Sequence, residues 1–360
     1  MKKISLFLMV LAICSCSKEI DEKKFSISGV VKNVEDNVSV KLFYNQLVID
    51  SSVIINNKFQ FRGSVDEPKE YLIVIEDTKD YASIWVENSK MTFEGESGSF
   101  RKVKITGSRT QKESEEHYKN FRKFLKEGDS VLRITMDESL PKEIRKSANE
   151  KYKANYSWRR KVDYDYIDQN PNSIFGVHLL DFYATTFGKE KTKKLYSKLS
   201  KKIKETSYGR SISKYLEVNQ DIRVGSKYVD FSLNDVDGKT VKLSDFQGKI
   251  VLLDFWNTNC GPCIQEFPFL KNAYQEFKNK GFEIVGVSDD KSEEKWSKMI
   301  QQKELSWVNL RNKNKLESTP HLIYGINGIP DNFLINQQGV IVARRLKGEK
   351  LIEKLQELTK

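Results

Sequence analysis

The pattern of apolar and polar positions changes twice along the chain and divides it into three regions. In the first, residues 25–108, short runs rich in valine, isoleucine, phenylalanine and tyrosine, such as FSISGVV and EYLIVIE, are separated by turn-forming residues. Strands of this length at this spacing predict a domain that resembles a β-sandwich. Within it, the stretch VIINNKFQFRG predicts a hairpin whose turn is formed by Asn56 and Asn57.

In the second region, residues 109–221, long charged and amphipathic stretches contain few glycines and prolines, which predicts a series of helices. The sequence NPNS ends one of them, and Ser173 can cap the next. In the lysine-rich run 189–204, apolar residues recur at helical spacing, so we interpret the lysines as the solvated face of a helix. The apolar residues are Leu195, Leu199 and Ile203.

The third region, residues 222–360, alternates between strand-like and helix-like runs. KIVLLDFW is continuously apolar, as expected of a buried central strand, and the segment after it predicts a helix that ends at Gly281. A strand (FEIVGVSDD), a helix capped by Ser292, a hairpin (DNFLIN and VIVARR) and a last amphipathic helix follow. A β-α-β unit followed by β-β-α is the order of the thioredoxin fold, so we predict an α/β thioredoxin-like domain at the C-terminus.

Composition narrows the class of protein. A chain of 360 residues is too long for one ordinary core, and 38% hydrophobic with 31% charged residues suits a soluble globular protein rather than a multi-span membrane protein. The net charge of +11 raises the question of nucleic acid. Since no zinc finger, RNA-binding aromatic signature or basic zipper accompanies this charge, we predict no nucleic-acid partner.

The N-terminus has the pattern of an export signal, in which two lysines precede an apolar run too short to span a bilayer. Ser15 before Cys16 resembles the lipobox of bacterial lipoproteins, which implies removal of residues 1–15, lipidation of Cys16 and a polar tether over 16–24. The alternative is an ordinary secretory signal with incidental cysteines. The lipoprotein interpretation predicts a cell-envelope protein that is anchored to a membrane and faces the periplasm, with an outer-membrane or surface location also open.

If Cys16 is acylated, Cys260 and Cys263 are the free thiols of the mature chain. A structural zinc needs four ligands, and His321 is the only histidine in this region, so we predict no metal. A structural disulfide across two residues would close so small a loop that it removes little entropy from the unfolded chain. A redox centre is the interpretation that explains the position of the pair.

The predicted elements favour Cys260 as the reactive thiol, because it follows the buried strand and opens the next helix. Free backbone N–H groups and the positive end of the helix dipole stabilise a thiolate there, which lowers the pKa of Cys260 from the ordinary value of about 8.5. Pro262 has no N–H to leave unpaired in the first turn. Cys263 lies one turn inside the helix, where it is more buried and can resolve a mixed disulfide.

Longer motifs around the pair resemble a known family. VLLDFWNTNCGPC is similar to the active-site strand and helix of thioredoxin. CIQEFP carries the C-x-x-E-x-P continuation typical of TlpA/ResA-type envelope thiol–disulfide oxidoreductases, which are thioredoxin-like members of the AhpC/TSA-redoxin superfamily. The resemblance spans roughly residues 224–360 and includes INGIPDNFLINQQGVIVARRLKG. On KFQFRG, EPKEYLIVI and ITGS, the first region resembles the DUF4369-type domain of Bacteroidetes lipoproteins.

The resemblance implies roles for individual residues. Cys260 matches the attacking cysteine and Cys263 the resolving cysteine. Pro330 matches the cis-proline that faces the dithiol, and the backbone of Ile329 before it is then turned towards a substrate that pairs as an added strand.

Two acids also match the family. Asp254 corresponds to the buried acid of thioredoxin, and burial would raise its pKa so that it accepts the proton of Cys263 near neutral pH. The alternative is that Asp254 is a polar residue tolerated in the core. Glu266, one turn beyond Cys263, matches the family glutamate near the dithiol.

Four further residues are implied at the substrate-facing surface. Gly261 and Pro262 lie between the cysteines, and Trp256 matches a tryptophan beside the site, although core packing alone would also explain it. Asn259 departs from the pattern, because relatives commonly carry tryptophan or another aromatic residue there. This departure leaves the substrate preference open but not the attacking chemistry, which does not use that side chain.

These features predict a lipid-anchored thiol–disulfide oxidoreductase whose redox centre is the Cys260–Cys263 dithiol, with no separate cofactor. The Gly-Pro spacer resembles that of thioredoxin, whose potential is about −270 mV, so we favour a reductase. The implied partners are client proteins that carry disulfides and a membrane thiol carrier that donates electrons. An apocytochrome, a misoxidised envelope protein and a small disulfide all remain open as substrates.

Two alternatives belong to other classes. A peroxidase of the AhpC/TSA type usually has threonine or serine three residues before its attacking cysteine, but Asn257 stands there. The other alternative is a non-enzymatic envelope binding protein with a residual dithiol. The intact set of Cys260, Cys263, Pro330, Asp254 and Glu266 argues against it.

Overall fold

The computed structural model describes residues 23–45, 47–76, 78, 80–119, 121–137, 139–312 and 320–360. Contacts divide the chain into two units, one that ends at Phe121 and one from Arg122 to Lys360. The predicted signal and the lipidation site at Cys16 lie outside the described residues. Within these ranges, no helix combines the length and the apolar character needed to cross a bilayer.

The first unit contains two four-stranded sheets, with orders β4-β1-β7-β8 and β3-β2-β5-β6. Their strands are β1 (Phe25–Lys32), β2 (Ser39–Tyr44), β3 (Leu47–Val53), β4 (Lys58–Gly63), β5 (Lys69–Ile75), β6 (Tyr81–Val86), β7 (Lys90–Glu96) and β8 (Lys104–Thr106). Along β1 and β4, buried residues alternate with more exposed ones, and one apolar cluster joins the inner faces of both sheets. The prediction of a β-sandwich-like domain is confirmed. A short 3-10 helix, η1 (Phe100–Lys102), and helix α1 (Arg109–Lys119) complete the unit.

The predicted hairpin around Asn56 and Asn57 is wrong in its pairing, although the turn itself is present. Both asparagines have positive φ, 49° and 63°, and Ile55 pairs with Lys58 across them. Beyond this bridge the strands separate, because β3 pairs with β2 while β4 pairs with β1. The turn therefore carries the chain from one sheet to the other. Alternation shows that a strand has one buried face, but it does not show which sheet the strand joins.

The second unit begins with helices α2 (Arg122–Met136), α3 (Lys142–Gln169), α4 (Ile174–Phe187), α5 (Lys189–Lys198), α6 (Lys201–Lys204) and α7 (Ser207–Val218). Ser173 caps α4 as predicted, since its hydroxyl accepts a hydrogen bond from the Gly176 N–H at 2.9 Å. The lysine-rich run forms two helices, α5 and α6, rather than one. Its apolar residues Leu195, Leu199 and Ile203 are all buried, and most of its lysines are exposed, so the lysines form the solvated side as predicted.

A seven-stranded sheet of order β10-β9-β13-β12-β11-β14-β15 follows. The strands are β9 (Ser232–Asp235), β10 (Thr240–Lys242), β11 (Ile250–Trp256), β12 (Phe282–Ser288), β13 (Val308–Arg311), β14 (Asp331–Ile335) and β15 (Ile341–Arg344). The central strand β11 is buried along its whole length, pairs in parallel with β12 and runs antiparallel to β14. This arrangement confirms the predicted α/β thioredoxin-like domain.

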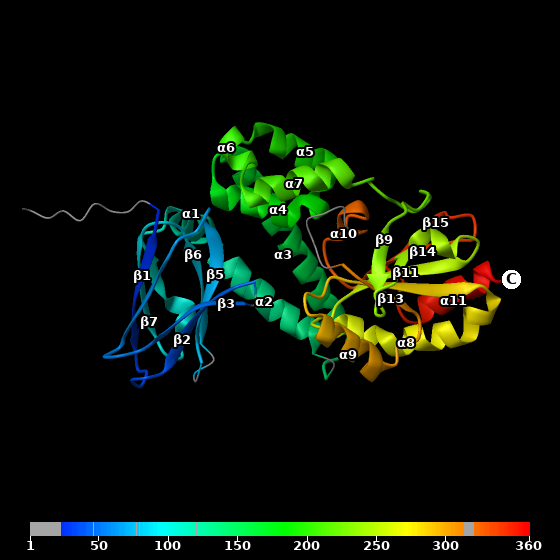
Figure 1. Cartoon of the computed structure of the whole chain (residues 1–360), viewed down its shortest axis with the longest axis horizontal. Coiled ribbons are helices and arrows are strands. Elements are labelled where there is room, and N and C mark those ends of the chain that lie inside the picture. Colours follow the sequence, from blue (N-terminus) through cyan, green and yellow to red (C-terminus); the bar gives the residue numbers. More distant parts are fainter. Residues whose placement is uncertain are drawn as a thin grey trace, which may run out of the picture. The chain divides into compact units, whose positions relative to one another are not determined.

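Helices cover both faces of this sheet (Figure 1). Apolar residues of α8 (Gly261–Phe277), α9 (Glu293–Lys303) and α11 (Glu349–Leu358) share one core cluster with Leu252 and Trp256 of β11. The opposite face carries Leu253 and Phe255, which pack with residues of α10 (Pro320–Ile323) and of the segment before β9. Since side chains alternate along a strand, Asp254 lies on the same face as Leu252 and Trp256. That is the face covered by α8, the helix that carries the cysteines.

Candidate active site

Cys260 and Cys263 form a disulfide, with their Cα atoms 5.2 Å apart. The pair lies where β11 has ended at Trp256 and α8 begins at Gly261. Cys260 is 8% exposed and Cys263 is 2% exposed. Both residues are buried, and Cys260, the residue expected to attack, is the more exposed of the two.

Cys260 is the N-cap of α8, and its sulfur accepts a hydrogen bond from the Cys263 N–H at 3.1 Å. Gly261 and Pro262 form the first turn, and both are exposed. Because the first N–H groups of a helix have no partner within it and the helix dipole is positive at this end, a thiolate at Cys260 is stabilised.

Polar residues at the end of β12 hold the loop between β11 and α8, and sequence reasoning did not identify them. Asp290 is 7% exposed and accepts hydrogen bonds from the Thr258 N–H at 3.0 Å, from the Thr258 hydroxyl at 2.6 Å and from the Ser288 hydroxyl at 2.7 Å. The amide of Asn257 donates to Asp289 at 2.9 Å. The sequence SDD after β12 could have indicated this network, because the carboxyl ends of the parallel strands β11 and β12 meet at one sheet edge.

Asn259, immediately before Cys260, is exposed, and its backbone N–H donates to the side-chain oxygen of Asn257 at 3.0 Å. Asn259 is thus a surface residue directly before Cys260 in the sequence. A substrate that approaches Cys260 meets an amide at this position rather than an aromatic ring.

Asp254 is a buried carboxyl, 5% exposed, that lies opposite Asn332 in the pairing of β11 with β14. Burial raises the pKa of Asp254 to about 7, and the nearby charges of Glu266 and Asp331 act in the same direction. A hydrogen bond with Asn332 opposes the increase in this pKa. A carboxyl with a pKa near 7 can both accept and release a proton at neutral pH.

Glu266 is half-buried on α8 and accepts a hydrogen bond from the Gly348 N–H at 3.2 Å. Because Gly348 is the N-cap of α11, this bond ties α8 to the beginning of α11. Its charge contributes to the raised pKa of Asp254, which places both acids in the same electrostatic environment.

The peptide bond between Ile329 and Pro330 is cis, the geometry that the family resemblance implied. Both residues are half-buried, and Ile329 packs against the core cluster that contains the two cysteines. The next residue, Asp331, is fully buried and forms ion pairs with Arg344 at 2.7 Å and Arg345 at 3.3 Å. These ion pairs, which the sequence did not indicate, fix the start of β14 directly after the cis-proline.

Trp256 is 1% exposed and contacts Phe267 of α8 edge to face, with the ring centres 5.4 Å apart. Its indole N–H is buried, with no hydrogen-bond partner among the described residues. These contacts are those of a core residue beneath α8, in keeping with the packing alternative considered above.

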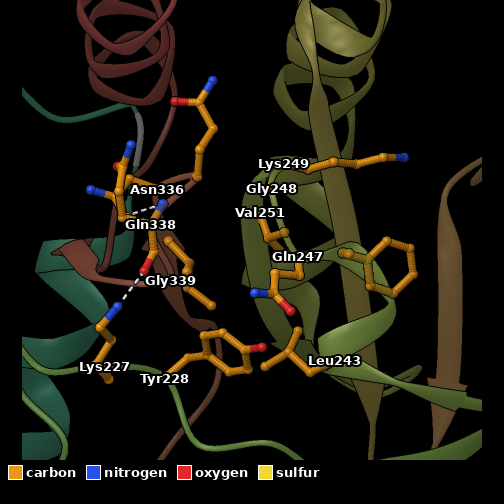
Figure 2. Close-up of a pocket in the computed structure, with 13 residues that line it drawn as sticks. Lys227, Tyr228, Leu243, Gln247, Gly248, Lys249, Val251, Asn336, Gln338 and Gly339 are labelled. Carbon is orange, nitrogen blue, oxygen red and sulfur yellow. Dashed lines mark hydrogen bonds between the residues drawn. The ribbon is translucent and has the colours of Figure 1, made fainter.

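A separate hollow of about 180 Å³ lies at the opposite end of β11 (Figure 2). It is lined by Val251, the second residue of that strand, together with lysines and amides such as Lys227, Lys249 and Gln338. Five residues of strand at about 3.3 Å each separate Val251 from Trp256, so the hollow is roughly 16 Å from the end of β11 that leads to the dithiol. Its lining contains no cysteine, histidine or carboxylate.

Comparisons with known proteins match both units. The AhpC/TSA family model matches residues 224–344, and the model of a domain of unknown function, DUF4369, matches residues 25–114. Thiol-disulfide oxidoreductase ResA of Bacillus cereus is 31% identical over 147 residues, which cover 41% of this chain and 82% of the relative. ResA of Oceanobacillus iheyensis is 37% identical over 134 residues, which cover 36% of this chain and 68% of that relative. Among solved structures, the thioredoxin domain of a thiol-disulfide oxidoreductase from Bacteroides vulgatus is 36% identical, with a TM-score of 0.37 and coverage of 39% of this chain and 99% of that chain.

The AhpC/TSA match at residues 224–344 spans the seven-stranded sheet and the Cys260–Cys263 disulfide at the start of α8, and the relatives named ResA are at least 30% identical. The chain therefore belongs to the TlpA/ResA-like thiol–disulfide oxidoreductases, with a DUF4369 domain ahead of its thioredoxin-like domain.

Proposed function

We propose that this enzyme reduces disulfides of client proteins in the bacterial cell envelope, where a lipid on Cys16 anchors it to a membrane. The observation that carries the catalytic part is the placement of Cys260 at the N-terminus of α8, with Cys263 one turn inside and the cis Ile329–Pro330 bond in the same domain. A dithiol in this position combines a stabilised thiolate with a second thiol that can resolve the first product.

The reaction proceeds in two exchanges. The Cys260 thiolate attacks one sulfur of the client disulfide, a mixed disulfide forms, and the other client sulfur leaves as a thiolate. Cys263 then loses its proton and attacks the Cys260 sulfur, which releases the second client sulfur as a thiolate and forms the Cys260–Cys263 disulfide. Two electrons pass from the dithiol to the client, and a membrane dithiol carrier returns them to the enzyme.

Asp254 is the proposed acceptor of the Cys263 proton. Two observations support this role. Asp254 lies on the side of β11 that faces α8, and burial raises its pKa to about 7. An ordinary surface carboxylate, with a pKa near 4, would be a much weaker base towards a thiol.

The direction of electron flow is proposed from the Gly-Pro spacer, and the reduction potential tests it. We expect a value near that of thioredoxin, about −270 mV, as measured by equilibration with glutathione or dithiothreitol. A value near that of a strong oxidant such as DsbA, about −120 mV, would contradict the reductase assignment.

The catalytic proposal is tested by reduction of insulin disulfides with the purified full chain. We expect the wild type to be active, Cys260→Ser to be inactive, and Cys263→Ser to accumulate a mixed disulfide that identifies the client in envelope extracts. The double serine variant is the matched control and should trap nothing. Rapid consumption of hydrogen peroxide without insulin reduction would instead favour the peroxidase alternative.

A further inference from the structure

The helical segment of the second unit holds the loop that leads to the cis-proline. Asn219, the C-cap of α7, is 3% exposed, and its side-chain amide donates to the backbone oxygens of Leu322 at 2.9 Å and Ile323 at 3.2 Å. The amide of Asn327 donates to the hydroxyl of Thr186 on α4 at 3.0 Å. Side chains of α4 and α7 are thus bonded to the segment that precedes the cis bond.

A cavity of about 440 Å³ lies where these elements meet. Its lining includes Asn257, whose backbone oxygen accepts from the Cys260 N–H at 3.1 Å, and Ile329, the first residue of the cis bond. Asp181 and Phe182 of α4 also line it. The cavity therefore adjoins both segments that flank the dithiol, and its volume is in the range of about 300–1,000 Å³ that is usual for ligand pockets.

The lining of this cavity combines carboxylates with apolar and neutral polar side chains. Asp181 and Asp289 are its carboxylates and His321 is its one histidine, whereas no lysine or arginine is among its lining residues, although the chain carries a net charge of +11. Burial raises the pKa of Asp181 to about 6, against a hydrogen bond with Ser211, so this carboxyl is still mainly ionised at neutral pH. Phe182 is 64% exposed and lines the same cavity as Asp181, so an aromatic side chain and a carboxylate are both available there. Carboxylates and aromatic faces both bind cationic side chains.

We propose that this cavity is a subsite for a lysine or arginine side chain that lies next to the reactive disulfide of the client. A client segment that extends along the cis-proline loop presents alternate side chains to one wall. The aliphatic part of a basic side chain then packs against Ile326 and Ile329, and its charged end reaches Asp181 beside Phe182. This inference rests on the proposed function, since it assumes that the client disulfide reacts with Cys260.

The test uses peptide dimers joined by one disulfide, identical except for arginine, glutamine or glutamate next to the cysteine. We expect the full chain to reduce the arginine dimer with the highest kcat/KM and the glutamate dimer with the lowest. Asp181→Asn should lower the preference for arginine over glutamine by up to about fivefold, because a partly exposed ion pair is worth up to about 1 kcal/mol. Phe182→Ala should lower it by a similar factor, because an exposed cation–π contact is worth about 0.5–1 kcal/mol. Asp165→Asn removes the same charge from an exposed position on α3 and should leave the preference unchanged.

A binding measurement separates the subsite from the chemistry. The arginine peptide with a methylated cysteine is titrated by fluorescence anisotropy into the Cys260→Ser/Cys263→Ser chain, with and without Asp181→Asn. Weaker binding with Asp181→Asn supports the subsite even if no dimer is reduced, in which case only the proposed function fails. Equal rates and equal binding for the arginine and glutamine peptides, or an arginine preference that survives Asp181→Asn, overturn the subsite while the reductase proposal stands.

Discussion

At the scale of single residues, Asp254 has opposite effects on stability and on chemistry. Its burial on β11 disfavours the charged carboxylate, so the folded state holds a proton more tightly than the unfolded chain does. The same environment brings its pKa to about 7, where proton transfer at neutral pH is efficient. If Asp254 served only core packing, its burial would still destabilise the folded state at neutral pH, but its removal would not slow the reaction. Unfolding and exchange kinetics measured on one variant therefore separate the two roles.

Asp254→Asn is expected to raise the free energy of unfolding at neutral pH. Its pKa is about 7 in the folded state and 3.8 ordinarily, so the wild type loses stability as pH rises between these values, and the neutral amide does not. The gain is at most about 4 kcal/mol above pH 7 and is absent below about pH 4. Urea unfolding of both oxidised proteins at about pH 4.5 and pH 8 measures it, with exposed Asp165→Asn as the control. A gain of the same size at both pH values would contradict the raised pKa.

The same variant is expected to slow the second exchange, in which Cys263 resolves the mixed disulfide. Loss of a general base typically costs ~10²-fold or more, and the loss should shrink as pH rises towards the ordinary thiol pKa. The first attack by Cys260 should change less, because its thiolate is stabilised mainly by the end of α8. Stopped-flow measurement of both steps is the test. If resolution is unchanged at every pH, Asp254 is a polar core residue and the proton goes to Glu266 or to water.

At the scale of elements, Trp256 belongs to the same apolar cluster as the two cysteines, and its packing depends on close contacts at Gly286 of β12. A Cβ atom there would lie 2.8 Å from the side-chain oxygen of Asn309 and 3.0 Å from the indole nitrogen of Trp256, both buried. We expect Gly286→Ala to lower the free energy of unfolding by about 1–3 kcal/mol, since overpacking a filled core has this effect. Thermal unfolding checks it, with Gly261→Ala as the control because its Cβ would meet nothing within 4 Å. Equal melting temperatures for Gly286→Ala and the wild type would show that the neighbours give way.

Local patterns in the sequence predict helices, strands and helix caps well. They predict poorly the hydrogen bonds between polar residues that are far apart in the sequence. The continuous apolar run of β11, the caps at Ser173 and Ser292 and the helix that follows Cys260 all rest on neighbours within a few positions, and the structure has each of them. The bonds from Thr258 to Asp290 and from Asn219 to Leu322 join residues 32 and 103 positions apart. No periodicity encodes such a pair. The only signal in the sequence for the support of the loop before Cys260 was the SDD stretch at the end of β12, and it becomes readable only once β11 and β12 are known to be parallel neighbours.

At the scale of the whole molecule, the proposed anchor lies at the other end of the sequence from the dithiol. The DUF4369 match begins at residue 25, directly after the tether predicted over residues 16–24, whereas the AhpC/TSA match begins at residue 224. The anchor can therefore be removed by a change that touches neither matched domain.

Cys16→Ser is expected to abolish lipidation and to release the protein from the membrane fraction, because several acyl chains at about 0.8 kcal/mol per buried methylene provide the proposed attachment. Labelling of cells with radioactive palmitate and fractionation without detergent measure both effects, and mass spectrometry of the native protein should show an acylated Cys16 as its first residue. Cys14→Ser is the matched control, since Cys14 would leave with the signal and its loss should change neither readout. Insulin reduction by the released protein should stay close to that of the wild type in detergent. Label that persists in Cys16→Ser, or a native chain that begins at another residue, would rule out Cys16 as the site of attachment.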